Sequence, residues 1–144
     1  MNLLQSLPEY EYFVYTLPQR HPVVQRSTLV VIRRGATIAV VRGEVEFPEG
    51  LRLVAREKLS FDQSPGQIRG YSYEVWYGDE QLYWYDSQPH PDDPSLASTH
   101  PHHKHIPPDI KHNRVPAPGL SFTQPNLPFL IEEIEGELLS DQTG

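Results

Sequence analysis

IRGYSYEVWYGDEQLYWY, residues 68–85, reads as two β-strands joined by a short turn at residues 78–79. Side chains alternate between the two faces of a strand, so Tyr71 and Tyr73 share one face and Ser72 lies on the other. Strands joined by so short a turn pair as an antiparallel hairpin. The tyrosine rings of both strands are therefore expected side by side on one sheet face, either as cross-strand packing or as a surface on which bases stack.

The segments before this hairpin repeat the pattern of short strands and turns. Strands rich in β-branched or alternating apolar residues are expected at residues 28–32, 37–47 and 51–61. Consecutive strands joined by short turns predict a twisted antiparallel meander of about five strands over residues 28–86.

Helices are expected at both ends of the chain. A helix over residues 8–17 begins at Pro8 and is predicted to end at Pro18. Residues 126–139 predict a second helix, with an apolar stripe facing the sheet and its glutamates on the opposite side. The stripe consists of Leu127, Leu130, Ile131, Ile134 and Leu138. The expected fold is a single α+β domain over residues 1–144, with both helices packed on the sheet.

The composition excludes several classes of protein and site. The 144 residues contain no cysteine, which excludes disulfides, thiolate metal sites and a cysteine nucleophile. There is neither an apolar run of membrane-spanning length nor a secretory signal, so a cytoplasmic protein is expected. A net charge of −7 opposes general nucleic-acid binding. The basic segment 20–58 and the acidic segment from residue 132 either form a mixed surface or allow local contact with an anionic partner.

Histidine is concentrated in one region of the chain. Six of the seven histidines lie between His90 and His112, and ten of the fifteen prolines lie between Pro89 and Pro128. This composition predicts a long loop over residues 87–124 that is neither helix nor strand. Residues 99–106 are nevertheless expected to pack against the sheet near Tyr73, Tyr85 and Asp86, with at least one imidazole buried, because a functional site needs fixed ring orientations.

The cluster Pro101-His102-His103-Lys104-His105 allows three interpretations. His103 and His105 point to the same side of an extended backbone, and with His90, His100 or Asp86 they would bind a divalent metal such as zinc. Without a cofactor, the imidazoles would act in general acid–base catalysis. In the third interpretation they only hold a loop in place by hydrogen bonds to the backbone.

Three charged residues outside the cluster are also candidates. Asp86, at the end of the fifth strand, either orients a ring such as His90 or begins a turn. Glu57 in the third strand is either a general base or a solvated or ion-paired residue of the basic face. Arg114 either binds a phosphate or anchors the loop to the acidic helix.

The order of these residues carries a family resemblance. The chain contains Leu53-x-x-x-Glu57, Tyr71-Ser72-Tyr73, Tyr85-Asp86, His90 and Pro101-His102-His103-Lys104-His105 in succession. It resembles the TumE-type family of bacterial toxin–antitoxin systems over residues 27–139, and is similar in particular to the cyanobacterial variety. The resemblance implies a toxin whose partner is a DNA-binding antitoxin, and analogy with other small toxins implies RNA cleavage.

The first hypothesis is therefore a metal-independent ribonuclease of a type II toxin–antitoxin module. The catalytic candidates are His102, His103, His105, Asp86 and Glu57, and the substrate-binding candidates are Tyr73, Tyr85, His90, Lys104 and Arg114. Imidazoles would supply the base and the acid, a cation would stabilise the phosphorane and tyrosines would stack the bases. The alternatives are a non-enzymatic protein-binding module and a metal-dependent hydrolase with His90, His103 and His105 as zinc ligands. Expected partners are the cognate antitoxin, RNA and a second copy of the chain, but no membrane.

Overall fold

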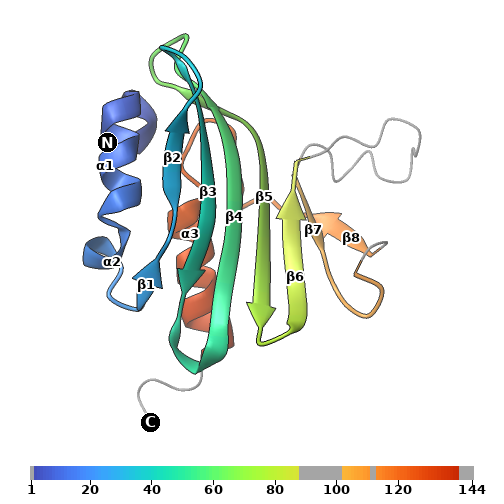
Figure 1. Ribbon diagram of the computed structural model, residues 1–144. Helices are drawn as coiled ribbons and strands as arrows, with labels where there is room; N and C mark the ends of the chain where they lie inside the picture. The colour runs from blue at the N-terminus through green and yellow to red at the C-terminus, as the bar shows by residue number, and fades with distance from the viewer. Residues whose placement is uncertain (1, 88–101, 111–112, 140–144) are drawn as a thin grey trace.

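The computed structural model describes residues 2–87, 102–110 and 113–139. These residues form an α+β fold in which one antiparallel sheet of eight strands lies in front of α3 (Leu127–Glu133) (Figure 1). We call the sheet face that packs on α3 the inner face and the opposite face the outer face. No helix in this part of the chain is long and apolar enough to cross a membrane.

The strands occur in the sheet in the order β1-β3-β4-β5-β6-β7-β8, and β2 also pairs with β3. Their bounds are β1 (Arg26–Ser27), β2 (Val30–Arg33), β3 (Ile38–Glu46), β4 (Leu51–Ser60), β5 (Gln67–Tyr77), β6 (Glu80–Asp86), β7 (His103–His105) and β8 (Arg114–Pro116). The other helical segments are η1 (Leu3–Gln5), α1 (Leu7–Tyr15), α2 (Leu17–Arg20), η2 (Pro48–Gly50) and the π-helical turn η4 (Ile134–Leu138).

The predicted antiparallel meander is confirmed from β2 to β6, but the sheet is larger than about five strands because β1, β7 and β8 also pair in it. The first strand, predicted over residues 28–32, begins only at Val30 as β2, and the unpredicted β1 precedes it. Thr28 and Leu29 separate the two strands where Gly43 of β3 lies close to the backbone. A Cβ at Gly43 would lie 2.6 Å from the carbonyl oxygen of Thr28. Glycine alone permits this approach, so β1 and β2 pair with β3 on either side of it.

The prediction that residues 87–124 form neither helix nor strand is wrong at β7 and β8. β7 pairs antiparallel with β6, and β8 pairs antiparallel with β7. Backbone N–H and C=O groups along the edge of β6 can pair with almost any extended segment, and this pairing overrides the low strand propensity of a histidine- and proline-rich chain. Pro116 has no N–H to donate, and it lies in the last strand of the sheet order, where that donor is not needed.

The N-terminal helix is confirmed in its apolar face but not in its bounds. The side chains predicted to face the core are buried: Tyr10, Phe13, Val14 and Leu17. Ser6 caps α1 by accepting a hydrogen bond from the N–H of Glu9 at 3.2 Å. The helix ends at Tyr15 rather than at Pro18, and Pro18 lies in the first turn of α2, where a missing N–H removes no helical hydrogen bond.

The C-terminal helix packs on the sheet through the predicted stripe. Leu138 of this stripe is partly buried. The other four residues are fully buried: Leu127, Leu130, Ile131 and Ile134. One glutamate contradicts the prediction that all of them face away from the sheet. Glu133 accepts hydrogen bonds from the hydroxyls of Tyr83 at 2.9 Å and Tyr85 at 2.7 Å, which join α3 to β6.

A buried carboxylate joins both helices to the sheet. Glu57 of β4 has 0% exposure, and its two oxygens accept hydrogen bonds from Tyr10 of α1 and Tyr73 of β5, each at 2.5 Å. Asn126, which precedes α3, donates to the Tyr73 oxygen at 3.1 Å. Burial raises the pKa of Glu57, and the tyrosine hydrogen bonds oppose that rise only in part. The interpretation of Glu57 as a solvated or ion-paired residue is therefore wrong, because strand alternation points it inward beneath α1.

Replacing Tyr10 with phenylalanine removes one hydrogen bond to the buried carboxylate without changing the apolar surface of the ring. We expect Tyr10→Phe to lower the free energy of unfolding by about 1–3 kcal/mol, measured by urea denaturation. Tyr12→Phe is the matched control on the same helix, since Tyr12 is 65% exposed. Equal midpoints for the two variants would contradict the structural role given to Glu57.

The raised pKa of Glu57 also predicts a pH dependence of stability. The folded chain binds this proton more tightly than the unfolded chain, whose glutamate pKa is about 4.3. Wild-type protein should therefore lose stability relative to Glu57→Gln as pH rises through 4.3 and on through the folded-state pKa. The loss is about 1.4 kcal/mol for each unit by which folding raises the pKa.

Urea denaturation of both proteins at pH values from 4 to 8 measures this difference. Glu11→Gln provides a control of opposite sign, because the hydrogen bond from Arg33 lowers the pKa of Glu11. Wild-type protein that gains stability relative to Glu57→Gln as pH rises, or whose relative stability does not change with pH, would refute the assignment.

Candidate functional site

The sheet register brings the predicted site residues of β6 and β7 together on the outer face. Asp86 pairs with His103, and Trp84 pairs with His105. Alternation along both strands directs these four side chains to one face. The prediction that His103 and His105 point to the same side is confirmed. Ser72 of β5 pairs with Asp86 on the side away from β7, so its side chain lies on the same face.

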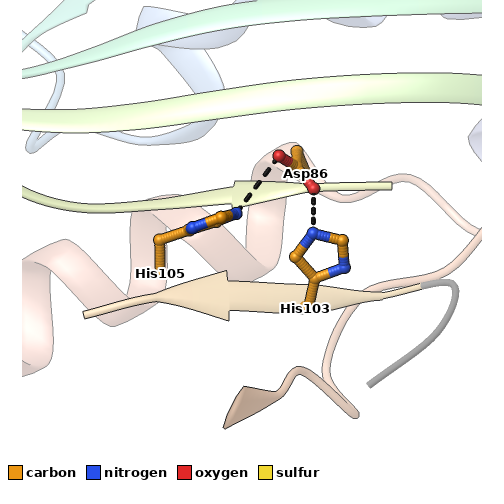
Figure 2. Close-up of side chains that lie close together, drawn as sticks. All are labelled: Asp86, His103 and His105. Atoms are coloured by element: carbon orange, nitrogen blue, oxygen red, sulfur yellow. Dashed lines mark hydrogen bonds and ion pairs between the residues drawn. The ribbon is translucent and has the colours of Figure 1, made fainter. Parts of the chain in front are cut away.

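Asp86 holds both imidazoles, one through each carboxylate oxygen (Figure 2). Its Oδ1 contacts Nε2 of His103, and its Oδ2 lies 3.2 Å from Nε2 of His105. His103 and His105 are 0% and 1% exposed, whereas the Asp86 side chain is 17% exposed. The carboxylate is therefore the most accessible member of the group.

The second ring nitrogen of His105 also faces an acceptor. Nδ1 lies 3.1 Å from the carbonyl oxygen of Ile110, which can only accept, so Nδ1 carries a proton. Nε2 faces the carboxylate of Asp86, which accepts as well when it is ionised. Both contacts are satisfied together when the ring carries two protons, or when a cation lies between Nε2 and the carboxylate.

Trp84 completes the surroundings of the carboxylate. Its Nε1 donates to Oδ2 of Asp86 at 3.1 Å, and its ring centroid lies 4.0 Å from that of His105. Burial by itself would raise the pKa of Asp86. Hydrogen bonds from the two histidines and from Trp84 outweigh burial and hold the pKa well below its usual range. Asp86 therefore stays ionised at neutral pH.

Asp86 also lines a cavity of about 480 Å³ on the outer face. Exposed cationic side chains share this cavity with it: Arg56, Lys58 and Arg69. A cavity of this volume falls within the range of small-ligand sites. The carboxylate thus stands between a cationic cavity on one side and two buried imidazoles on the other.

Arg114 lies beside the imidazoles. It is the register partner of His105 on β8 and shares the outer face with it. Within the described ranges, its buried Nε has no hydrogen-bond partner. An unsatisfied buried donor costs roughly 1–3 kcal/mol, so an anionic acceptor placed there would offset that cost.

Two other residues of the histidine cluster point to the inner face, because they alternate with His103 and His105. His102 Nδ1 lies 2.6 Å from the hydroxyl of Tyr71. Lys104 Nζ lies 3.6 Å from Oε2 of Glu133 and 4.2 Å from the ring centroid of Tyr83. The structure therefore does not bring His102 or Lys104 to Asp86.

The predicted stacking tyrosines belong to the core. Their arrangement side by side on one face is confirmed, since Tyr73 pairs with Tyr85 across β5 and β6. Tyr73 and Tyr85 are 0% and 3% exposed, because α3 covers the inner face. The interpretation of these rings as a surface for bases is wrong, and the alternative of cross-strand packing is correct.

Glu57 is also separated from the imidazoles. Its neighbour Arg56 pairs with Ser72, which pairs with Asp86, so Arg56 points to the outer face. Because successive side chains alternate, Glu57 points to the inner face. His90 lies outside the described residues, as do residues 99–101. The expected ordering of the histidine segment against the sheet with a buried imidazole is confirmed for the part that is described, residues 102–106.

The group Asp86, His103 and His105 can support two kinds of chemistry. One imidazole can donate a proton and the other accept one, with the carboxylate fixing both rings. Alternatively, the three donor atoms, which all lie within 4.8 Å of one another, can hold a divalent metal ion. The contact of His105 Nδ1 with a backbone carbonyl is also typical of metal-binding histidines.

Two parts of the site are missing from the sequence prediction. Trp84 contacts both Asp86 and His105, and its position two residues before Asp86 was the only available signal. The second part is the set of cations around the cavity. Arg56 and Lys58 alternate within β4, but Arg69 comes from the start of β5, and only sheet pairing brings it to them.

Comparison with known proteins finds a family match. The family described as toxin TumE matches residues 14–138, a range that includes all three residues of the Asp86 group. No curated protein and no solved structure matches the chain.

The geometry predicts that Asp86 is also important for stability. Asp86→Ala leaves two buried imidazoles facing an apolar methyl group, and breaking a largely buried pair in this way costs about 3–5 kcal/mol. We therefore expect a lower urea midpoint for Asp86→Ala, whereas Asp79→Ala in the exposed β5–β6 turn should stay within about 0.5 kcal/mol of wild type. Equal stability of the two variants would mean that Asp86 does not hold the rings.

Proposed function

The chain belongs to the TumE family of toxins, and from this membership we propose that it is the toxin of a type II toxin–antitoxin pair and cleaves RNA without a metal ion. One observation supports the proposal above the others. Asp86 lines the cationic cavity and also holds two imidazoles, so a bound phosphodiester would lie next to a pair of proton-transfer groups.

Cleavage of RNA by its own 2′-hydroxyl needs two proton transfers. A base removes the 2′-hydroxyl proton, the oxygen attacks the adjacent phosphorus, and an acid protonates the departing 5′-oxygen. His105 suits the acid, since both of its nitrogens face acceptors and the doubly protonated ring satisfies both contacts. His103 is then the base, and Asp86 orients both rings.

The attack also places extra negative charge on the phosphate. Arg114, opposite His105, is the cation for this charge, because its buried Nε lacks an acceptor within the described ranges. Preorganised donors of this kind commonly contribute 10²–10³-fold in rate. Lys104 and Arg114 were the two cations predicted for this role, and we assign it to Arg114, since Lys104 lies on the inner face beside Glu133.

A metal-dependent hydrolase is the second candidate. It is favoured by the three donor atoms of Asp86, His103 and His105 within 4.8 Å and by the carbonyl contact of His105 Nδ1. Elemental analysis and cleavage in EDTA separate the two candidates. Metal-free protein that cleaves RNA in EDTA supports the first, and one bound zinc with activity lost in EDTA supports the second.

The test of the ribonuclease itself uses induced expression, with growth and RNA integrity as readouts. His103→Gln, His105→Gln and Arg114→Ala should each reduce cleavage by about 100-fold or more. His21→Gln is the matched control, because His21 follows α2 far along the chain from the site. Circular dichroism should show folded protein for Arg114→Ala, whose side chain is partly exposed.

Undiminished growth arrest and RNA cleavage in His105→Gln and Arg114→Ala would reject the site. Growth arrest without any RNA cleavage would instead favour the non-enzymatic binding module. A toxin–antitoxin pair also predicts that co-expression with the cognate antitoxin restores growth for the wild type.

A further inference from the structure

We propose that the outer face of the sheet binds the backbone of single-stranded RNA along a row of cations that leads to Asp86. The row is formed by four exposed side chains: Arg42 of β3, Arg56 and Lys58 of β4, and Arg69 of β5. The inference names the substrate class of the proposed ribonuclease. It rests on the proposed function for the cleavage step but not for the binding of RNA.

The register arranges these residues across the strands. Arg42 pairs with Arg56, Arg56 pairs with Ser72, and Ser72 pairs with Asp86. Neighbouring strands lie about 4.7–4.9 Å apart, so the path from β3 to β6 measures roughly 14 Å. Lys58 and Arg69 lie beside this path, in the cavity that Asp86 lines.

The four cations are not held in close ion pairs with other described residues. Three carboxylates other than Asp86 lie near these cations: Glu44 pairs with Arg52, Glu74 accepts from the uncharged indole of Trp76, and Asp62 interacts electrostatically with Arg69. The four cations outnumber these carboxylates. Like charges gathered in this way create a local positive potential on a chain of net charge −7, and an anionic polymer would neutralise it.

The shape of the face favours a single strand over a duplex. Two cavities of about 460 and 480 Å³ meet at Arg56 and Ser72, and each has the size of a small-ligand site. A flexible strand can place successive nucleotides in the two cavities, whereas a duplex is too wide to enter either. A flexible strand can also adopt the in-line geometry that 2′-hydroxyl attack requires.

Binding of a non-cleavable probe tests the inference separately from catalysis. The probe is a fluorescein-labelled octamer of 2′-O-methyluridine, whose blocked 2′-oxygen cannot attack, and fluorescence anisotropy measures its Kd for the full chain. With four phosphate contacts, log K should fall with log salt at a slope of about −2.8, since single strands contribute about −0.7 per contact. Arg56→Ala and Arg69→Ala should each weaken binding roughly fivefold at 0.1 M salt and reduce the slope to about −2.1.

Arg26→Ala is the matched control, because Arg26 is exposed on β1 and pairs with Glu46 away from the row. It should leave the Kd unchanged. Equal Kd values for Arg56→Ala, Arg69→Ala and Arg26→Ala would overturn the assignment. Equal affinity for an RNA duplex of the same length would also overturn it. Displacement of the octamer by an equal concentration of octaglutamate would overturn it too, and would indicate that the face binds an acidic protein segment instead. Specific binding of the octamer by a chain that cleaves no RNA would retain the RNA-binding face and reject only the ribonuclease.

Discussion

The buried carboxylate of Glu57 is the constraint on which the arrangement of this molecule depends. It joins α1 through Tyr10 and β5 through Tyr73, and the Tyr73 hydroxyl in turn accepts from Asn126 at the start of α3. A carboxylate removed from water raises the free energy of the folded state unless its oxygens are hydrogen-bonded. Displacing either helix from the inner face would break part of this network and destabilise the fold. The network therefore selects one docking of two helices on a sheet whose apolar contacts alone are less directional.

Alternation along the strands divides the sheet into two faces with different roles. Glu57 and its neighbour Arg56 point in opposite directions, as do Tyr85 and Asp86. The inner face is filled with apolar and aromatic side chains under α3. The outer face keeps the charged residues and the two cavities. Residues that are adjacent in sequence thus serve stability and the candidate site separately.

The candidate site depends on β7 as much as on its own side chains. Pairing with β6 places His103 opposite Asp86 and His105 opposite Trp84, and both imidazoles are buried. The same strand turns Lys104 inward, where it contacts Glu133 and the ring of Tyr83 and so helps to attach β7 to α3. A segment dominated by histidine and proline is therefore built into the sheet on both sides, which is what fixed ring orientations require.

Local pattern determined the strands from β2 to β6, the apolar faces of the two helices and the shared direction of His103 and His105. These features follow from periods of two and 3.6 residues, which neighbouring side chains express by themselves. The sequence named Asp86 as one of several candidate partners of the imidazoles. Only the tertiary structure decided that β7 pairs with β6 and so places Asp86 against both rings, and that Glu57 is buried rather than solvated. Pairing at a sheet edge is made by backbone groups common to every residue, and the burial of a strand face depends on which helix covers it. Neither is encoded in the local order of side chains, so both had to come from the folded chain.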